Sequence, residues 1–275
     1  MNRTESDGNT GKGFEMGSVE QKRRNWSMEE TIVAFYVYCI VPFASSSKTS
    51  PTIVHYANLL SRTPSALNMK IGNIGRLDPE LKKKNITGLD HGAKMEEIVW
   101  DLFVHDKAKL VYEAEKIIKK LSAEPIEPAS LQPNDIDYSG KERTRSNRTR
   151  VGQGFFRTSV LSAYNNTCAI TGLQINELLI ASHIMPWAQD ENNRLNPHNG
   201  ICLNAIHDKA FDLGLITIDK SYRVAISSKL KEHYSQGFID DVFKKYESTK
   251  ILIPIRFKPS IEFLEYHNDV IFKGV

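Results

Sequence analysis

The chain has 275 residues, enough for two modest domains, and its 40% hydrophobic and 25% charged residues are ordinary for a globular protein. No segment reaches the roughly 20 apolar residues of a membrane span, and the N-terminus lacks the apolar core of a signal peptide. Cys39, Cys168 and Cys202 form no C-x-x-C pair, which excludes a disulfide framework and a zinc ribbon, so we expect a reduced, cytoplasmic protein. A net charge of +3 is too small by itself to indicate a nucleic-acid partner.

Helices dominate the first half of the chain. Residues 1–25 are polar without an apolar period and predict a disordered tail. Ser27, with Glu30 three residues later, is typical of a capping box, and the apolar residues 31–41 that follow predict a buried helix ending before Pro42. A long amphipathic helix is expected at residues 94–121, which would complete a helical domain over residues 26–121.

Within this domain, residues 52–60 and 65–77 have helical spacing and are joined by a short turn that ends at Pro64. The pattern is that of a helix-turn-helix, although taken alone it favours an ordinary αα-hairpin that packs a small core. The second helix carries polar side chains suited to DNA, namely Asn68, Lys70, Asn73 and Arg76. We therefore expect a DNA-recognition module here.

A linker is predicted at residues 122–150. Its first part is rich in proline and acidic residues, which resist helix formation. Its second part is a dense basic run that contains Arg143, Arg145, Arg148 and Arg150. Such a run is commonly a solvated surface, but beside a DNA-recognition module we expect it to contact phosphates.

Polar residues that a core does not need interrupt the apolar runs of residues 168–218. A short apolar strand at residues 178–181 leads directly to Ser182 and His183. After a polar loop, Asn199-Gly200 turns the chain into a second apolar run at residues 201–203. Asn204 is a suitable cap for a helix that Gly214 can end. This order would bring His183 together with His207, 24 positions later.

The arrangement resembles the HNH nucleases, whose ββα-metal fold holds one divalent cation and one histidine base against a scissile phosphate. The phrases ASHIMPW, NPHNGICLNAIHDKAFDLGLITID and VGQGFFRTSVLSAYNNTCAITGL resemble the branch of predicted bacterial restriction endonucleases. WSMEETIVAFYVY and RTPSALNMKIGNIGRLDP resemble the N-terminal module of the same branch. The resemblance implies an α+β protein, with an all-α helix-turn-helix-like domain followed by a ββα-metal nuclease domain at residues 151–275.

The resemblance also implies roles for single residues. His183 would be the general base, His207 a metal ligand at the helix start, and Asn199 the residue that fastens the loop. Ser182 stands where many HNH enzymes have an aspartate or histidine ligand. Asp208, Asp212 or Asn204 could complete an oxygen-rich shell, which favours Mg²⁺ or Mn²⁺ over Zn²⁺. The alternatives are that the two aspartates lie on the helix surface and that Asn204 only caps the helix.

Arg157 lies on a predicted helix at residues 155–164 and is expected to reach the scissile or a neighbouring phosphate, whereas a structural role would pair it with Asp208 or Asp212. A strand at residues 222–226 and helices at 239–246 and 261–272 are expected to brace the nuclease core. His267 has no polar constellation around it and is expected to serve packing or a surface contact.

The sequence thus predicts a metal-dependent endonuclease of restriction type that cuts double-stranded DNA at a specific or modified site. The chain has no methyltransferase motif, so cutting would need a separate modification enzyme or modified bases. A homodimer would explain double-strand cutting, although sequential nicking would also serve. The alternatives are a non-catalytic DNA-binding regulator with a degenerate HNH fold, and a homing or mobile-element nuclease with the same chemistry.

Overall fold

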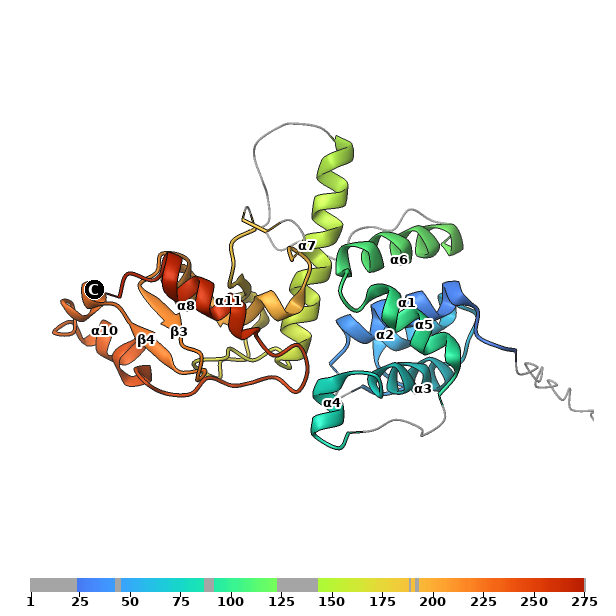
Figure 1. Ribbon diagram of the computed structural model, residues 1–275, viewed down its shortest axis with the longest axis horizontal. Helices are drawn as coiled ribbons and strands as arrows, with labels where there is room; N and C mark the ends of the chain where they lie inside the picture. Colours follow the sequence, from blue (N-terminus) through green and yellow to red (C-terminus); the bar gives the residue numbers. More distant parts are fainter. Residues whose placement is uncertain are drawn as a thin grey trace, which may run out of the picture.

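The computed structural model describes residues 24–42, 46–86, 92–122, 143–187, 189–190 and 193–274, with the backbone alone for residues 143–150. Most of the predicted tail and the first part of the predicted linker lie outside these residues. Figure 1 shows an all-helical N-terminal part beside a C-terminal part of helices and short strands, with one long helix between them. None of the described helices is both long and apolar enough to cross a membrane.

Helix α1 (Met28–Ile40) is the centre of the N-terminal part. Ser27 and Glu30 form the expected capping box at its start. The helix is buried nearly all round, since α3, α5, α6 and α7 pack against it. A helix without a polar face needs such neighbours, because its apolar surface would otherwise remain in water.

The other N-terminal helices surround α1. α2 (Pro51–Leu59) and α3 (Pro64–Gly75) form the expected hairpin, and α4 (Pro79–Lys83) follows after an Asp78 cap. The single helix expected at residues 94–121 is wrong, because the chain forms α5 (Lys94–Phe103) and α6 (Lys107–Leu121). The break is stabilised locally: Asp106 accepts a hydrogen bond from the Lys109 amide, and the Lys107 ammonium donates to the carbonyls of Phe103 and Val104.

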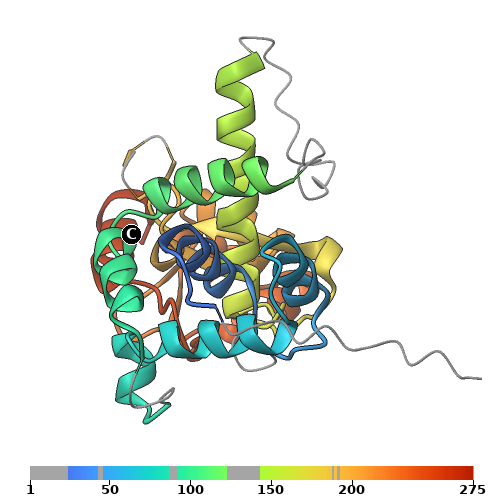
Figure 2. The ribbon, with the colours of Figure 1, turned by 90° about the vertical axis from the view of Figure 1, so that its right-hand side faces the viewer.

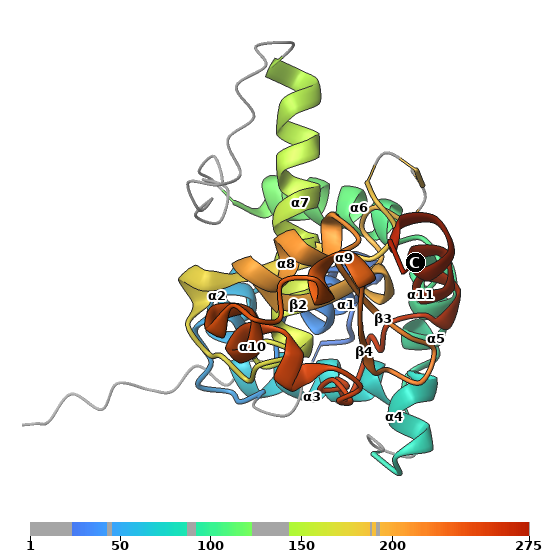
Figure 3. The ribbon, with the colours of Figure 1, turned by 90° about the vertical axis from the view of Figure 1, so that its left-hand side faces the viewer.

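Helix α7 (Arg143–Ala163) differs from the expectation of a linker that ends at residue 150. It begins inside the basic run, whose arginines are good helix formers. Figures 1, 2 and 3 show that its N-terminal half extends beyond both parts of the molecule. Its C-terminal half is buried through Phe155, Phe156 and Val160.

The expected strand–loop–strand–helix unit follows α7. After a 3₁₀ turn at Asn176–Leu178, β1 (Leu179–His183) pairs antiparallel with β2 (Gly200–Asn204), which a 3₁₀ turn at Pro197–Asn199 precedes. β2 leads into α8 (Ala205–Asp212), where Asn204 accepts hydrogen bonds from the amides of Ile206 and His207. Gly214 follows with a φ of +66°, a backbone conformation that favours glycine.

A second small sheet and short helices complete the C-terminal part. β3 (Ile216–Ile218) pairs antiparallel with β4 (Val224–Ile226). The helices are α9 (Ser228–Lys231), α10 (Gly237–Val242), a 3₁₀ turn at Lys244–Tyr246 and α11 (Ile261–Tyr266). The helix expected at residues 261–272 instead widens into a π-helix, η5 (His267–Ile271).

The N-terminal and C-terminal parts are packed against each other. The buried Arg256 guanidinium donates to the carbonyls of Tyr38 and Val41 at the end of α1, and so satisfies groups that a helix end leaves without partners. The Ser162 hydroxyl in α7 lies 3.4 Å from the carbonyl oxygen of Cys39. Apolar residues of both parts belong to one hydrophobic core.

Candidate active site

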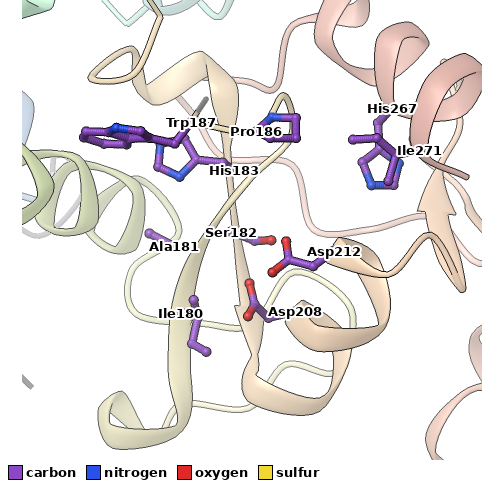
Figure 4. A pocket seen from close by; sticks show the side chains of 10 residues that line it. All are labelled: Ile180, Ala181, Ser182, His183, Pro186, Trp187, Asp208, Asp212, His267 and Ile271. Carbon is purple, nitrogen blue, oxygen red and sulfur yellow. The ribbon is translucent and has the colours of Figure 1, made fainter. Parts of the chain in front are cut away.

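A cavity of about 500 Å³ opens beside β1 and α8. Its polar lining includes Ser182 and His183 from the end of β1 and Asp208 and Asp212 from α8 (Figure 4). The remaining lining residues are Ile180, Ala181, Pro186, Trp187, His267 and Ile271. The structure therefore brings together four of the residues that the sequence predicts for catalysis or metal binding.

His183 is held in one tautomer. Its Nε2 lies 3.1 Å from the carbonyl oxygen of Arg194, and because a carbonyl can only accept, Nε2 carries the hydrogen. Nδ1 therefore keeps its lone pair in the neutral ring. The ring stacks on Phe156 at 3.8 Å between centroids and meets the edge of Trp187. Burial lowers the pKa of His183, partly offset by the Arg194 carbonyl, so the neutral form that can accept a proton is favoured.

Gly200 leaves room for Phe156 of α7 to stack on the His183 ring. It lies opposite His183 in the β1–β2 register. A Cβ atom at this position would lie 2.4 Å from Val160 Cγ2 and 2.9 Å from Phe156 Cζ. The missing side chain thus lets Phe156 approach the imidazole.

Asn199 is hydrogen-bonded to the loop that follows His183. Its Oδ1 accepts from the amide of Met185 at 2.8 Å, and its Nδ2 donates to the carbonyl of the same residue at 3.1 Å. Its own carbonyl accepts from the amide of Ile184. These bonds join both ends of the loop just after His183, so the side chain holds the loop and does not line the cavity.

Asp208 and Asp212 are one helical turn apart and share one face of α8. Figure 4 shows their carboxyl groups and the Ser182 hydroxyl directed toward one another. Burial and then the charge of Asp212 raise the pKa of Asp208 to about 6, partly offset by the nearby Ser182 hydroxyl and by Lys209. Burial likewise raises the pKa of Asp212. Two carboxylates that repel each other in a partly buried cavity favour a bound proton or a bound cation.

The Ser182 hydroxyl completes this group. Ser182 is 2% exposed, and its oxygen makes no hydrogen bond of standard geometry within the part of the chain that the structure describes. No three or more His, Cys, Asp and Glu side chains gather into a metal cluster within the same part of the chain. The donors are instead two carboxylates and one hydroxyl. They fit a hard cation such as Mg²⁺ or Mn²⁺, which takes oxygen ligands and keeps several waters.

His207 differs from its expected role as a metal ligand. It is 1% exposed and lies outside the cavity lining. Its Nε2 donates to the carbonyl of Val242 at 2.8 Å, and its Nδ1 accepts from the side-chain amide nitrogen Nδ2 of Asn204 at 2.9 Å. Both ring nitrogens are thus engaged, and no lone pair is directed at the cavity. In this position His207 joins α8 to α10.

Arg157 is also placed away from the cavity. Its guanidinium lies 3.4 Å from the carbonyl oxygen of Asn176, and the ion pairs among the described residues do not connect it to Asp208 or Asp212. The alternative pair with Asp208 or Asp212 is thus not formed among the described residues, and the phosphate contact stays a prediction. The side chain remains half-buried on α7.

The polar side chains predicted on α3 contact neighbouring residues of the protein, and Lys70 is buried among them. Lys70 Nζ lies 2.6 Å from Glu96 Oε1 in a buried ion pair, and Arg76 pairs with Glu96 and Glu97. Asn73 donates to Glu96, and Asn68 accepts from Ser46. Glu96 and Glu97 of α5 thus pair with the cations of α3, and the expected DNA contacts stay a prediction. The side chains of Arg143, Arg145, Arg148 and Arg150 lie outside the described part.

Three features of the cavity escaped the sequence analysis. Phe156 lay in a predicted helix, but nothing local showed that it would stack on His183. Trp187, in the phrase ASHIMPW, forms a wall of the cavity, a role that the sequence analysis did not assign to it. His267 and Ile271 enter from the C-terminal π-helix, 50 or more positions beyond α8. The Pro-Trp pair that begins three positions after His183 is a signal that could have indicated a site wall.

The strand–loop–strand–helix unit and its cavity define a ββα nuclease-type domain, with a neutral histidine at the end of the first strand and carboxylates on the helix. Residues 168–219 match the family model described as HNH endonuclease. No curated protein matches the chain. The chain thus contains an HNH endonuclease domain, which supports a nuclease that acts on DNA.

Proposed function

We propose that the protein is a metal-dependent DNA endonuclease of restriction type. The observation that carries the proposal is the cavity of the HNH domain, where neutral His183 and the oxygen donors of Ser182, Asp208 and Asp212 lie together. Phosphodiester hydrolysis needs a deprotonated water, a neutralised phosphate and a stabilised leaving oxygen. A histidine base and a cation site can supply these three functions.

His183 acts as the general base in this proposal. Its Nδ1 takes the proton of the attacking water, and the Arg194 carbonyl stabilises the imidazolium that forms. Phe156 and Asn199 position the ring and the loop that follows it. Asp208 and Asp212, with Ser182, hold a single Mg²⁺ or Mn²⁺. When bound, a divalent cation supplies positive charge to the phosphate and the leaving oxygen.

Double-stranded DNA is the proposed substrate, and the N-terminal half of α7 is the proposed place of contact. This segment carries Arg143, Arg145, Arg148 and Arg150, and it extends away from the rest of the chain (Figure 1). Arginines bind phosphates and release counterions, which gives affinity without sequence preference. The helical N-terminal part would then add recognition of a site or a modified base, through surfaces other than the α3 side chains that pair with Glu96 of α5. A homodimer or sequential nicking would cut both strands.

Plasmid cleavage tests this function directly. Supercoiled DNA from methylating and non-methylating hosts is incubated with the full chain and EDTA, Mg²⁺ or Mn²⁺. We expect nicked or linear product only with metal, and His183→Ala should lower the rate by ~10² to 10⁴ while DNA binding persists. His233→Ala, at an exposed position, is the matched control. An EDTA-resistant rate, or a near-normal rate for folded His183→Ala, contradicts the proposal.

Sequencing the cleavage ends tests the restriction assignment separately. Genomic DNA with and without methylation is cut, and the sequence around each end is compared. A shared sequence whose cutting depends on methylation supports restriction. Cutting without any common sequence or modification would leave a nuclease of another type.

The second candidate is a non-catalytic DNA-binding regulator with a degenerate HNH fold. One observation favours it: both ring nitrogens of His207 are engaged outside the cavity, at a place where the resemblance implies a metal ligand. The same assay separates the candidates. Metal-independent DNA binding with no product in Mg²⁺ or Mn²⁺ would support the regulator.

A further inference from the structure

A second histidine, His267, lines the same cavity from outside the segment that matches the HNH family. It begins the π-helix η5, and with Ile271 it forms one side of the cavity (Figure 4). It is 1% exposed and contributes no charge pair to the described residues. A buried polar side chain at this place needs partners, and those partners show what it holds.

His267 is bound to the end of α8. Its Nε2 lies 3.1 Å from the carbonyl oxygen of Phe211, so this nitrogen carries the hydrogen, and its Nδ1 accepts from the Thr217 hydroxyl at 2.8 Å. The ring also stacks on Phe211 at 3.7 Å between centroids. Phe211 directly precedes Asp212 in the chain. One imidazole thus fixes both the backbone and the side chain of the residue before a carboxylate of the cavity.

The π-helix is the geometry that allows this contact. The Phe272 amide donates to the His267 carbonyl five residues earlier, which widens the turn and places His267 and Ile271 on the same side. The Lys273 amide then donates to the Gly214 carbonyl at 2.9 Å. A Cβ atom on Gly214 would lie 2.0 Å from the Ile271 carbonyl oxygen, so this close approach needs glycine.

β3 is joined to the same segment. Asn268 donates through Nδ2 to the carbonyl of Ile218 at 2.8 Å, beside the bond between Thr217 and His267. The C-terminal turn is therefore connected both to the last turn of α8 and to the strand that follows. Movement of η5 would disturb Asp212, because His267 is hydrogen-bonded directly to the residue before it.

We propose that His267 is a positioning residue of the nuclease site: by holding the Phe211 carbonyl and ring, it directs the Asp212 carboxylate toward Asp208 and Ser182. This inference rests on the proposed function, in which that carboxylate binds the cation. It also makes η5 a part of the site, although η5 lies about 50 residues beyond the end of the matched segment. A neutral imidazole suits the task, because it donates to a carbonyl without adding charge beside the carboxylates.

The test uses Mn²⁺ as the probe and the full chain. The variants are His267→Leu, which removes both hydrogen bonds, and His267→Gln, whose amide can still donate to the Phe211 carbonyl. His233→Leu is the matched control at an exposed histidine. Mn²⁺ binding without DNA is followed by the electron paramagnetic resonance signal of free Mn²⁺, and the Mn²⁺ dependence of cleavage is measured at saturating DNA.

We expect His267→Leu to raise the half-maximal Mn²⁺ concentration by about tenfold or more, as the loss of a residue that orients a ligand usually does. His267→Gln should recover part of this loss, which a purely apolar packing role would not allow. A folded His267→Leu with the wild-type Mn²⁺ dependence overturns the inference. If His267→Leu does not fold, Thr217→Val is used instead, because it removes the hydrogen bond from the Thr217 hydroxyl to the ring. A wild-type Mn²⁺ dependence in Thr217→Val would likewise overturn the inference.

The two proposals fail in different ways. If wild-type protein neither binds Mn²⁺ nor cuts DNA, the proposed function is wrong. If wild-type protein does both and the His267 variants match it, only the role of His267 is wrong.

Discussion

His207→Ala separates two roles for the histidine of α8. As a structural residue, His207 satisfies the Val242 carbonyl and the Asn204 amide in a buried place. Without the ring, the Val242 carbonyl loses its partner, which costs about 1 kcal/mol at the lower bound, and the cavity left by the ring costs roughly 2 kcal/mol more, whereas the Asn204 side-chain amide keeps its contact with Thr171. The free energy of unfolding should therefore fall by roughly 3 kcal/mol, which corresponds to a drop in Tm of roughly 6 to 12 °C for a chain of this size.

Thermal melting and a metal titration of cleavage together decide the question. We expect the large drop in Tm, with a Mg²⁺ dependence close to that of wild type at a temperature where the variant is folded. Ile206→Ala, at the neighbouring exposed position on α8, should change neither quantity by much. Two results together would refute the structural role and make His207 a ligand. The first is a Tm within about 2 °C of wild type, which is less than the loss of one buried hydrogen bond should cause. The second is a tenfold higher Mg²⁺ requirement for cleavage.

Two further substitutions test the packing around the site and the N-terminal part. Gly200→Ala places a methyl group against Val160 and Phe156, so it should lower the free energy of unfolding by about 1 to 3 kcal/mol and slow single-turnover cleavage. The Gly200→Ala/Val160→Ala double variant should recover both. A wild-type rate and Tm for Gly200→Ala would contradict the close contact. Lys70→Met leaves the buried Glu96 charge without its closest partner, so the free energy of unfolding should fall by about 3 kcal/mol while the affinity for DNA stays unchanged. A large loss of DNA affinity in a folded variant would instead place Lys70 at the DNA interface.

Local signals in the sequence predicted much of the fold. Ser27 caps α1, Asn204 caps α8, and Gly214 takes the left-handed conformation after it, because each signal acts within a few residues. The break between α5 and α6 was missed although Asp106 is a good cap. The apolar positions before and after it continue one helical spacing, and this pattern concealed the break.

The site was only partly predictable, because its remaining features depend on contacts between distant segments. His207 and Asp208 are neighbours, and an eight-residue helix has too few apolar positions to show which of them faces the cavity. Lys70 pairs with Glu96, which lies 26 residues later in the chain, and His267 bonds to Phe211, which lies 56 residues earlier. The sequence carries no local mark of either pair, so a cationic helix face and an isolated histidine were the natural predictions.

The basic half of α7 offers the last test, since this cationic segment extends from the body of the described chain (Figures 1 and 2). Glutamine replaces arginine at positions 143, 145, 148 and 150 with nearly the same helix propensity, so α7 should persist. If all four arginines contact phosphates, the slope of log Kd against log salt should fall by about 0.9 for each contact, with unchanged Tm.

The matched control removes charge from another exposed place. Lys82, Lys83 and Lys84 at the end of α4 are changed to glutamine in the full chain. Because long-range attraction depends on net charge, both variants should lose some affinity at low salt. Only the α7 variant should show the reduced salt slope, because released counterions count close contacts and not distant charge. Equal slopes in the two variants would mean that α7 makes no close contact with the DNA backbone, and DNA would then have to reach the His183 cavity along another surface of the protein.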